Sequence, residues 1–261
     1  MKAISLLYHD VLPPAGPAVT GFMDAGSLIY KFSEAEFRRH MEILAATGLV
    51  PCPNILSAPA QQNLFLLTFD DGGISSRDVI AGILEERGWR GHFFITTGQI
   101  GSPGFLSVPA LRDLHQRGHV IGSHSCTHPS RFSSLAGPAM AREWQESRQR
   151  LEDLLGTPVL TASVPGGYYS RRVAASAIAA GYQALFNSEP VSSVREWRGC
   201  RIFGRYSVQR GVSADTAAAL ATGDTVACGR QYLLWNLKKV AKGAGGQLWL
   251  RFRERLLERQ L

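Results

Sequence analysis

The 261-residue sequence contains no run of about 18 apolar residues, so a membrane-spanning helix is not expected. A cleaved signal peptide is not expected either, because the short apolar run near the N-terminus ends at His9 and Asp10. The four cysteines are far apart and form no CxxC pair, which argues against a disulfide scaffold and against a cysteine-based zinc site. These absences indicate a globular protein of a reducing compartment such as the cytoplasm.

Positive charge is concentrated at one end of the chain. The net charge is +7, and residues 229–261 alone hold eight basic and two acidic residues, so the rest is close to neutral. We expect a main domain over residues 1–228 and a basic amphipathic segment over residues 229–261. The apolar residues of that segment are expected to pack on the main domain, and the alternative is that they lie on an anionic membrane surface. No nucleic-acid recognition motif accompanies the basic residues, so nucleic-acid binding is not expected.

Strand-like and helix-like segments alternate along the main domain. Apolar runs predict strands over residues 3–8, 63–69, 92–96, 119–122, 159–164, 182–186 and 201–208. Amphipathic patterns predict helices over residues 33–46, 75–87, 108–116, 139–155 and 171–180. The first helix opens with Ser33 and Glu36, which have the spacing of a capping box. Repeated strand–helix units predict a parallel sheet, either open or closed into a barrel.

Two adjacent carboxylates follow the most apolar of these strands, in the run Thr68-Phe69-Asp70-Asp71-Gly72-Gly73. Neighbouring side chains of an extended chain point to opposite sides, so Asp70 and Asp71 can share a face only if the strand ends there. The two glycines permit such an end. An Asp-Gly pair is also typical of a simple turn. The position at the carboxyl end of a strand, where α/β folds place their sites, favours a functional role.

Two histidines follow another predicted strand, in the run His124-Ser125-Cys126-Thr127-His128. Neutral imidazoles are good ligands for zinc and similar ions. Two unrelated polar histidines are the alternative interpretation, but the aspartate pair at another strand end favours a metal site. Cys126 lies between the histidines and is expected to be a small buried thiol rather than a third ligand.

Together the two clusters resemble the polysaccharide deacetylases, carbohydrate esterase family four. Thr68-Phe69-Asp70-Asp71-Gly72 matches the family's first motif, TFDDG, and His124-Ser125-Cys126-Thr127-His128 matches the second, His-Ser/Thr-x-x-His. The resemblance covers most of the chain except its C-terminal part. It implies an α/β fold, namely the distorted (β/α)7 barrel of this family.

The resemblance also implies a role for each of four residues. Asp71, His124 and His128 would hold one divalent metal ion, and Asp70 would be the general base that acts on the metal-bound water. Three protein ligands leave an open position for water and substrate, as a catalytic metal requires. Zinc is the first choice for two histidines and a carboxylate, and cobalt, nickel and manganese are the alternatives.

The family's third motif, Arg-x-Pro-Tyr, is altered in this sequence. Ser163 stands where the family has the arginine that steadies the base, and Arg205 is a candidate to replace it from a neighbouring strand. The backbone N–H of Gly166 is a candidate for binding the oxyanion. We therefore group Gly166, Tyr168 and Arg205 as predicted substrate-binding or oxyanion residues. A tight turn is the alternative interpretation of the Pro-Gly-Gly run over residues 165–167.

The family's C-terminal catalytic histidine is also missing, because all seven histidines lie at or before residue 128. His9, at the end of the first predicted strand, follows Tyr8. This Tyr-His pair resembles the circularly permuted members of the family, such as the poly-N-acetylglucosamine deacetylases, and implies that His9 is the general acid. A histidine can release a proton near neutral pH. The alternative is a capping or core histidine.

These assignments predict a hydrolase that removes an acyl group, preferably N-acetyl, from a sugar or glycan, which is a reaction at the C–N bond of a linear amide. An O-acetyl esterase or a deformylase would use the same residues. A degenerate member that binds glycan without hydrolysing it is the alternative from another class, motivated by the missing arginine. The predicted partner is an acetylated sugar or glycan. A lipid-linked glycan and a membrane surface contacted by the basic segment belong to the alternative interpretation of that segment. The expected location is the cytoplasm, and the inner face of the membrane is the location that the alternative implies.

Overall fold

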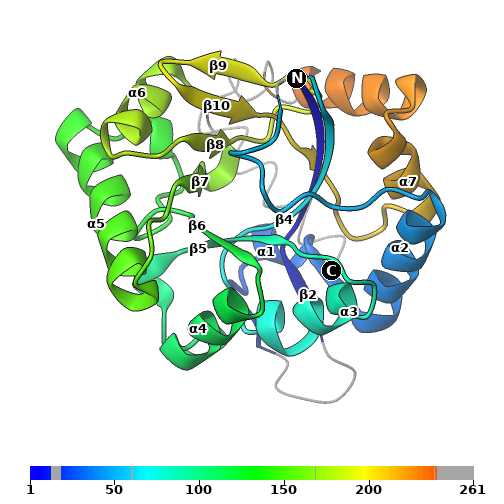
Figure 1. The fold of residues 1–261 in the computed structure, drawn as a ribbon, viewed down its shortest axis with the longest axis horizontal. Coiled ribbons are helices and arrows are strands. Elements are labelled where there is room, and N and C mark those ends of the chain that lie inside the picture. The colour runs from blue at the N-terminus through cyan, green and yellow to red at the C-terminus, as the bar shows by residue number, and fades with distance from the viewer. Residues whose placement is uncertain (13–18, 60, 168, 238, 240–261) are drawn as a thin grey trace.

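Nine strands of the described residues form one curled sheet at the centre of the molecule, and the helices lie around it (Figure 1). This computed structural model describes residues 1–12, 19–59, 61–167, 169–237 and 239. The order across the sheet is β11 (Tyr206–Ser207), β1 (Lys2–Tyr8), β4 (Asn63–Phe69), β5 (His92–Ile95), β6 (Val120–Ser123), β7 (Thr161–Ser163), β8 (Ala184–Phe186), β10 (Cys200–Phe203) and β9 (Arg195–Trp197). All neighbours are parallel except β9, which is antiparallel to β10. The predicted parallel sheet and the distorted (β/α) barrel are confirmed.

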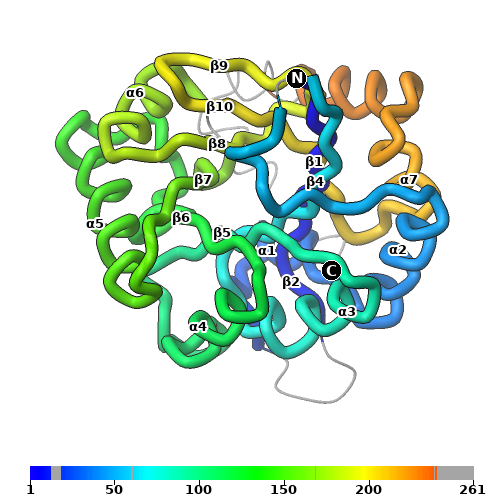
Figure 2. Tube along the Cα trace, viewed as in Figure 1, coloured from blue at the N-terminus to red at the C-terminus, as the bar shows by residue number. Residues whose placement is uncertain are grey.

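The last predicted strand closes the barrel as two pieces. Its first half, β10, pairs with β8, and its second half, β11, pairs with β1. Gly204 and Arg205 lie at the bend between the two pieces. In the trace of Figure 2, the start of the chain lies beside the yellow segment that precedes β9. The two ends of the predicted strand order therefore meet, although no single straight strand joins them.

Helices cover the outside of the sheet, as Figure 1 shows. Those that the sequence predicted are α2 (Glu34–Ala46), α4 (Val108–Gln116), α5 (Gly137–Leu155), α6 (Arg171–Ala179) and, after a π-helical turn over Ser76–Ile80, α3 (Ala81–Glu85). Ser33 and Glu36 form the predicted capping box at the start of α2. The elements that the sequence analysis did not predict are β2 (Asp10–Leu12), α1 (Ala25–Leu28), β3 (Lys31–Ser33), β9 and α7 (Ala214–Thr222).

Alternate side chains of β4 belong to two different clusters of buried residues. Leu64 and Leu66 belong to a small cluster inside the barrel, whereas Phe65 and Leu67 belong to a larger cluster under the helices. The strand is apolar throughout because both of its faces are covered. Since side chains alternate along a strand, the inner row continues to Asp70, at the carboxyl end of β4. The strand thus delivers this carboxylate to the mouth of the barrel.

A buried ion pair attaches the segment after β1 to the barrel. Lys31 Nζ lies 2.9 Å from Asp10 Oδ2, with only 2% and 3% of the two side chains exposed. The hydroxyls of Thr20 and Ser75 donate to the other carboxylate oxygen of Asp10, at 2.7 and 2.8 Å. Buried charges are tolerated where they are paired and hydrogen-bonded in this way. The pair therefore fixes residues 19–33 beside the barrel mouth.

The C-terminal part of the described chain is helical over residues 225–237, across the predicted domain boundary. Leu233, Leu234 and Leu237 of this helix are 60%, 46% and 58% exposed. The expectation that the apolar residues of the basic segment pack on the main domain is therefore wrong for these three leucines. Residues 240–261 lie outside the described residues. Within the described ranges, no helix combines the length and hydropathy needed to cross a membrane.

Candidate metal and catalytic site

The chain turns sharply where β4 ends, and this turn brings the two aspartates together. Asp71 has a φ of +78°, in the left-handed region, and Gly72 follows with +83°. His124 Nε2 lies 3.8 Å from Asp70 Oδ2 and 3.5 Å from Asp71 Oδ1, so both carboxylates face the same imidazole. Both aspartates are buried. The strand has ended at this point, which is the condition that a shared face required.

The two predicted histidine ligands stand at the ends of a tight loop after β6. Ser125 and His128 have φ values of +65° and +56°, which is unusual for residues other than glycine. The centroids of the His124 and His128 rings are 4.9 Å apart. His128 Nε2 lies 3.7 Å from Asp71 Oδ1. The loop therefore directs both imidazoles toward one carboxylate.

Asp71, His124 and His128 fit a divalent cation. Their ligand atoms all lie within 4.8 Å of one another. A tetrahedral ion with bonds of about 2.1 Å holds its ligand atoms roughly 3.4 Å apart, which is close to the 3.5 and 3.7 Å that separate Asp71 Oδ1 from His124 Nε2 and His128 Nε2. Burial and the like charge of Asp70 raise the pKa of Asp71 well above its usual range, a cost that a cation would remove. Burial lowers the pKa of His124 to about 3 and also lowers that of His128, so both imidazoles are neutral, as ligands must be.

Arg205 pairs with Asp70 inside the barrel. Its Nη1 and Nη2 donate to Asp70 Oδ1 and Oδ2 at 2.7 and 2.8 Å, and its Nε donates to the Asn187 carbonyl at 2.9 Å. The guanidinium carbon lies 5.7 and 6.0 Å from the ring centroids of Phe94 and Phe186. Burial raises the pKa of Asp70, but the charge and hydrogen bonds of Arg205, together with the nearby imidazoles of His124 and His9, outweigh burial and hold this pKa well below its usual range. Asp70 therefore remains ionised beside a second carboxylate.

Ser163, which the resemblance predicts to stand in place of the family's arginine, connects Asp70 to His124. Its hydroxyl donates to Asp70 Oδ1 at 3.1 Å and lies 2.5 Å from His124 Nδ1. A hydroxyl that directs its proton to Asp70 must accept a proton from Nδ1–H. His124 therefore carries its proton on Nδ1 and turns the lone pair of Nε2 toward Asp71. Second partners of this kind commonly fix the tautomer of a metal-binding histidine.

His9 lies directly after β1, at the same end of the barrel. Its ring stacks on Tyr30 with centroids 4.1 Å apart, and the Tyr30 hydroxyl accepts a hydrogen bond from Gln209 Nε2 at 3.0 Å. His9 Nδ1 is buried and has no hydrogen-bond partner among the described residues. Burial lowers the pKa of His9 to about 4, while the nearby charge of Asp70 acts in the opposite direction. The structure thus brings His9 within electrostatic range of Asp70, and its role as acid stays a prediction.

The remaining predicted residues have different placements. Gly166 is exposed just after β7 and has a φ of +62°, and its role at the oxyanion stays a prediction. Tyr168 lies outside the described residues. Arg205 has no exposed surface and contacts Asp70, a placement that suits the steadying of a base. Cys126 is half-buried and is not part of the Asp71–His124–His128 group.

Two aromatic residues at this site had no sequence signal. Tyr30 stacks on His9, and Phe22 lies against His128 with ring centroids 5.0 Å apart. Both belong to the segment held by the Asp10–Lys31 pair. No local pattern marks them, because their contacts depend on an ion pair between residues 21 positions apart.

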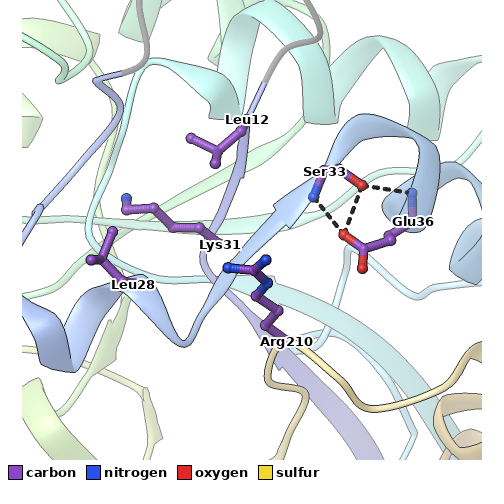
Figure 3. Close-up of a pocket in the computed structure, with 6 residues that line it drawn as sticks. All are labelled: Leu12, Leu28, Lys31, Ser33, Glu36 and Arg210. Carbon is purple, nitrogen blue, oxygen red and sulfur yellow. Dashed lines mark hydrogen bonds between the residues drawn. The ribbon is translucent and has the colours of Figure 1, made fainter. Parts of the chain in front are cut away.

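A cavity of about 270 Å³ is lined by other residues, namely Leu12, Leu28, Lys31, Ser33, Glu36 and Arg210 (Figure 3). Two of its polar side chains form the capping box of α2, drawn dashed in the figure, and its ammonium group is paired with Asp10. The cavity is therefore a gap between packed elements, separate from the aspartates and histidines described above.

Comparison with known proteins places these residues in a family. Residues 57–185 match the family model of the polysaccharide deacetylases. YxkH of Bacillus subtilis, a protein assigned to the polysaccharide deacetylases, is 25% identical over 191 residues, which are 70% of this chain and 68% of YxkH. A chitin deacetylase of Pestalotiopsis is 30% identical over 108 residues, 41% of this chain and 35% of that protein.

A solved structure has the same fold. IcaB from Ammonifex degensii superposes with a TM-score of 0.67 at 19% identity, over 85% of this chain and 97% of IcaB. At this level of identity the likeness shows the fold, and the chemistry must be argued from the residues of this chain.

Proposed function

This chain carries a polysaccharide deacetylase domain, and from that membership we propose that it removes the N-acetyl group of an acetylated sugar or glycan by metal-dependent hydrolysis. The main observation behind the proposal is that a possible metal-ligand group and an ion-paired carboxylate lie side by side at the barrel mouth. Asp71, His124 and His128 converge as a ligand group, and Asp70 lies beside them with a paired guanidinium. A ligand set next to an ionised carboxylate is the arrangement of a hydrolytic metal enzyme.

Zinc is the ion that we propose for the ligand group, with cobalt, nickel or manganese as alternatives. A divalent ion held by one carboxylate and two imidazoles would acidify a water molecule and polarise the acyl carbonyl. Because Ser163 sets the tautomer of His124, the lone pair of His124 Nε2 is free to bind this ion.

The residues of the chain would move two protons. Asp70, kept ionised by Arg205, takes a proton from the attacking water. Negative charge that develops on the acyl oxygen favours the protonated imidazole of His9, whose pKa burial otherwise lowers, and His9 then protonates the departing amine. The exposed backbone of Gly166 is proposed to donate to the same oxygen.

The direct test measures metal content and acetate release. The purified protein is assayed on N-acetylglucosamine oligomers, on an O-acetyl ester and on an N-formyl sugar, before and after chelation and zinc restoration. We expect acetate release from the oligomers, loss of it with chelator and recovery with zinc. A zinc-loaded protein that releases no acyl group from any of these substrates would contradict the proposal.

The alternative of a degenerate glycan-binding member is weakened by one contact. The missing arginine motivated that alternative, but Arg205 supplies a bidentate partner to Asp70 from the bend between β10 and β11. A binding protein has no need to keep a buried carboxylate ionised beside a ligand group. Tight binding of acetylated oligomers without turnover or bound metal would restore this alternative.

A membrane contact is the second part of the proposal. Val226, Leu233 and Leu237 are spaced to share one face of the helix over residues 225–237, and they are 77%, 60% and 58% exposed. Residues 229–261 carry eight basic residues against two acidic ones, so an anionic lipid surface is the matching partner. We propose that the protein works at the cytoplasmic face of the membrane on a lipid-linked acetylated glycan.

Vesicle co-sedimentation tests this contact. The protein should pellet with vesicles that contain anionic lipid, remain in solution with neutral vesicles, and dissociate as salt increases. The double variant Leu233→Glu and Leu237→Glu should lose binding, whereas the double variant Val19→Glu and Val50→Glu, which adds the same two charges at other exposed apolar positions, should bind normally. Wild-type protein that stays in solution with anionic vesicles at low salt would refute the membrane contact.

A further inference from the structure

The loop that carries both predicted histidine ligands is held by one side chain of the neighbouring helix. Glu143 of α5 accepts hydrogen bonds from the backbone N–H groups of Cys126 and Thr127 on the same oxygen, Oε2, at 2.9 and 2.8 Å. Its other oxygen, Oε1, accepts from the Thr127 hydroxyl at 2.6 Å. These three bonds all go to the residues between His124 and His128. Hydrogen bonds to a charged acceptor are among the stronger ones in proteins.

The opposite edge of the same loop is held by the segment after β5. Thr97 N donates to the Ser125 carbonyl at 3.1 Å, and Gly98 N donates to the Cys126 carbonyl at 2.7 Å. A Cβ atom at Gly98 would lie 2.6 Å from that Cys126 oxygen, so only glycine allows this approach. The loop is therefore bound on both edges, by Glu143 on one and by residues 97–98 on the other.

This double attachment explains how the loop keeps a strained backbone. Ser125 and His128 both have positive φ values, which are unfavourable for residues with a Cβ atom. Such conformations persist where surrounding contacts hold them. Helix α5 is itself fixed, because Trp144 next to Glu143 is fully buried and Ser147 bonds the Ser123 hydroxyl at 2.7 Å.

We propose that Glu143 is a positioning residue for the metal, which holds the loop so that His124 and His128 reach one ion together. The inference rests on the proposed metal site. Glu143 is not part of the Asp71–His124–His128 group and acts on it through the loop, so its effect should appear first in metal affinity. Outer partners of metal ligands typically change affinity by about 10–100-fold when they are removed.

The test compares the zinc dissociation constants of four variants by competition with a chromophoric chelator. Glu143→Leu removes all three acceptor bonds and should weaken zinc binding by about 10–100-fold. Glu143→Asp keeps the charge but shortens the reach, and it should also weaken binding. Glu143→Gln should stay close to wild type, because its amide oxygen can accept from both N–H groups and its NH₂ can donate to the Thr127 hydroxyl oxygen.

Glu146→Leu is the matched control. Glu146 is an exposed acid one turn along α5, so this variant removes the same charge with no bond to the loop, and zinc affinity should not change. If Glu143→Leu and Glu143→Asp bind zinc as the wild type does, the positioning role is wrong while the metal site stands. If Glu143→Leu does not fold, the zinc affinities of Glu143→Asp and Glu143→Gln test the positioning role by themselves: weaker binding in Glu143→Asp alone supports it, and equal binding in both contradicts it. A wild-type protein that binds no divalent metal would overturn both the metal site and the role of Glu143.

Discussion

Arg205 and Asp70 form a buried bidentate ion pair, with distances of 2.7 and 2.8 Å, although they are 135 positions apart in the sequence. The arginine comes from the bend of the closing strand and not from the motif where the family has it. The positive charge beside Asp70, the proposed base, therefore comes from a different element. The pair connects the bend at Gly204 and Arg205 directly to the proposed base.

Removing this arginine should affect both stability and pH dependence. In Arg205→Met the buried Asp70 loses its partner, which should lower the unfolding free energy by about 3–5 kcal/mol. The pKa of Asp70 should rise, so the acid limb of kcat/KM should move to higher pH, since the base works only when ionised. Urea unfolding and a pH–rate profile measure both effects. Arg142→Met, at an exposed position of α5, is the control, and an unshifted acid limb in Arg205→Met would contradict the role assigned to the pair.

Loss of any one metal ligand should remove the metal without unfolding the protein. Asp71→Ala, His124→Ala and His128→Ala each leave two ligands, too few to hold a catalytic ion tightly. The site lies at the barrel mouth and outside the two apolar clusters, so circular dichroism should remain native. Metal analysis of the purified variants makes the measurement. Full occupancy in His128→Ala would remove His128 from the ligand set.

Variants of the proposed base and of the proposed acid should differ in how their loss of activity depends on the substrate. Asp70→Asn should keep its metal and lose about 10²–10⁴-fold in turnover on every substrate, as general bases do. His9→Ala should lose a similar factor on an amide and much less on an activated ester, because that leaving group departs without a proton. Steady-state kinetics on an N-acetyl sugar and an aryl acetate compare the two variants. Equal losses of His9→Ala on both substrates would indicate that His9 is structural.

His92 should make the metal-free protein less stable in mild acid. It is fully buried, its Nε2 lies 2.9 Å from the Cys52 carbonyl, and burial lowers its pKa from 6.5 to about 4. Between these two values the unfolded state binds more protons than the folded state, so the unfolding free energy falls as the pH falls through that window. Urea midpoints at about pH 7.5 and about pH 5, with chelator present, measure the fall. His92→Gln keeps a hydrogen-bond donor but does not titrate, so its urea midpoint should decrease less between the two pH values than that of the wild type. An equal decrease in the variant would show that other histidines cause the effect.

The parts of the fold that the sequence predicted are those encoded locally. The apolar run over residues 63–69 needs no distant partner to be recognised as a buried strand, and the capping box of Ser33 and Glu36 lies within one helical turn. The aspartate and histidine motifs are also contiguous. Their convergence followed from the rule that carboxyl ends of parallel strands meet at one edge of a sheet.

The parts that were missed depend on contacts between distant residues. The bend at Gly204 and Arg205 is set by pairing of β10 and β11 with different strands, which periodicity alone does not show. Tyr30 reaches His9 only because the Asp10–Lys31 pair anchors its segment. The exposure of Leu233 and Leu237 could not be predicted either, because an apolar helix face looks the same in sequence whether or not anything covers it.

The place of β1 between β4 and β11 also sets an order of assembly during synthesis. Leu6 pairs with Tyr206, so closing the barrel joins residues about 200 positions apart, a slow and entropically costly step. Asp71, His124 and His128 all leave the ribosome well before that strand. A nascent chain, or one cleaved after residue 204, would therefore possess its ligand residues while Asp70 still lacks its counter-charge. The burial of Asp70 is therefore matched by a counter-charge only when the last strand docks beside the first.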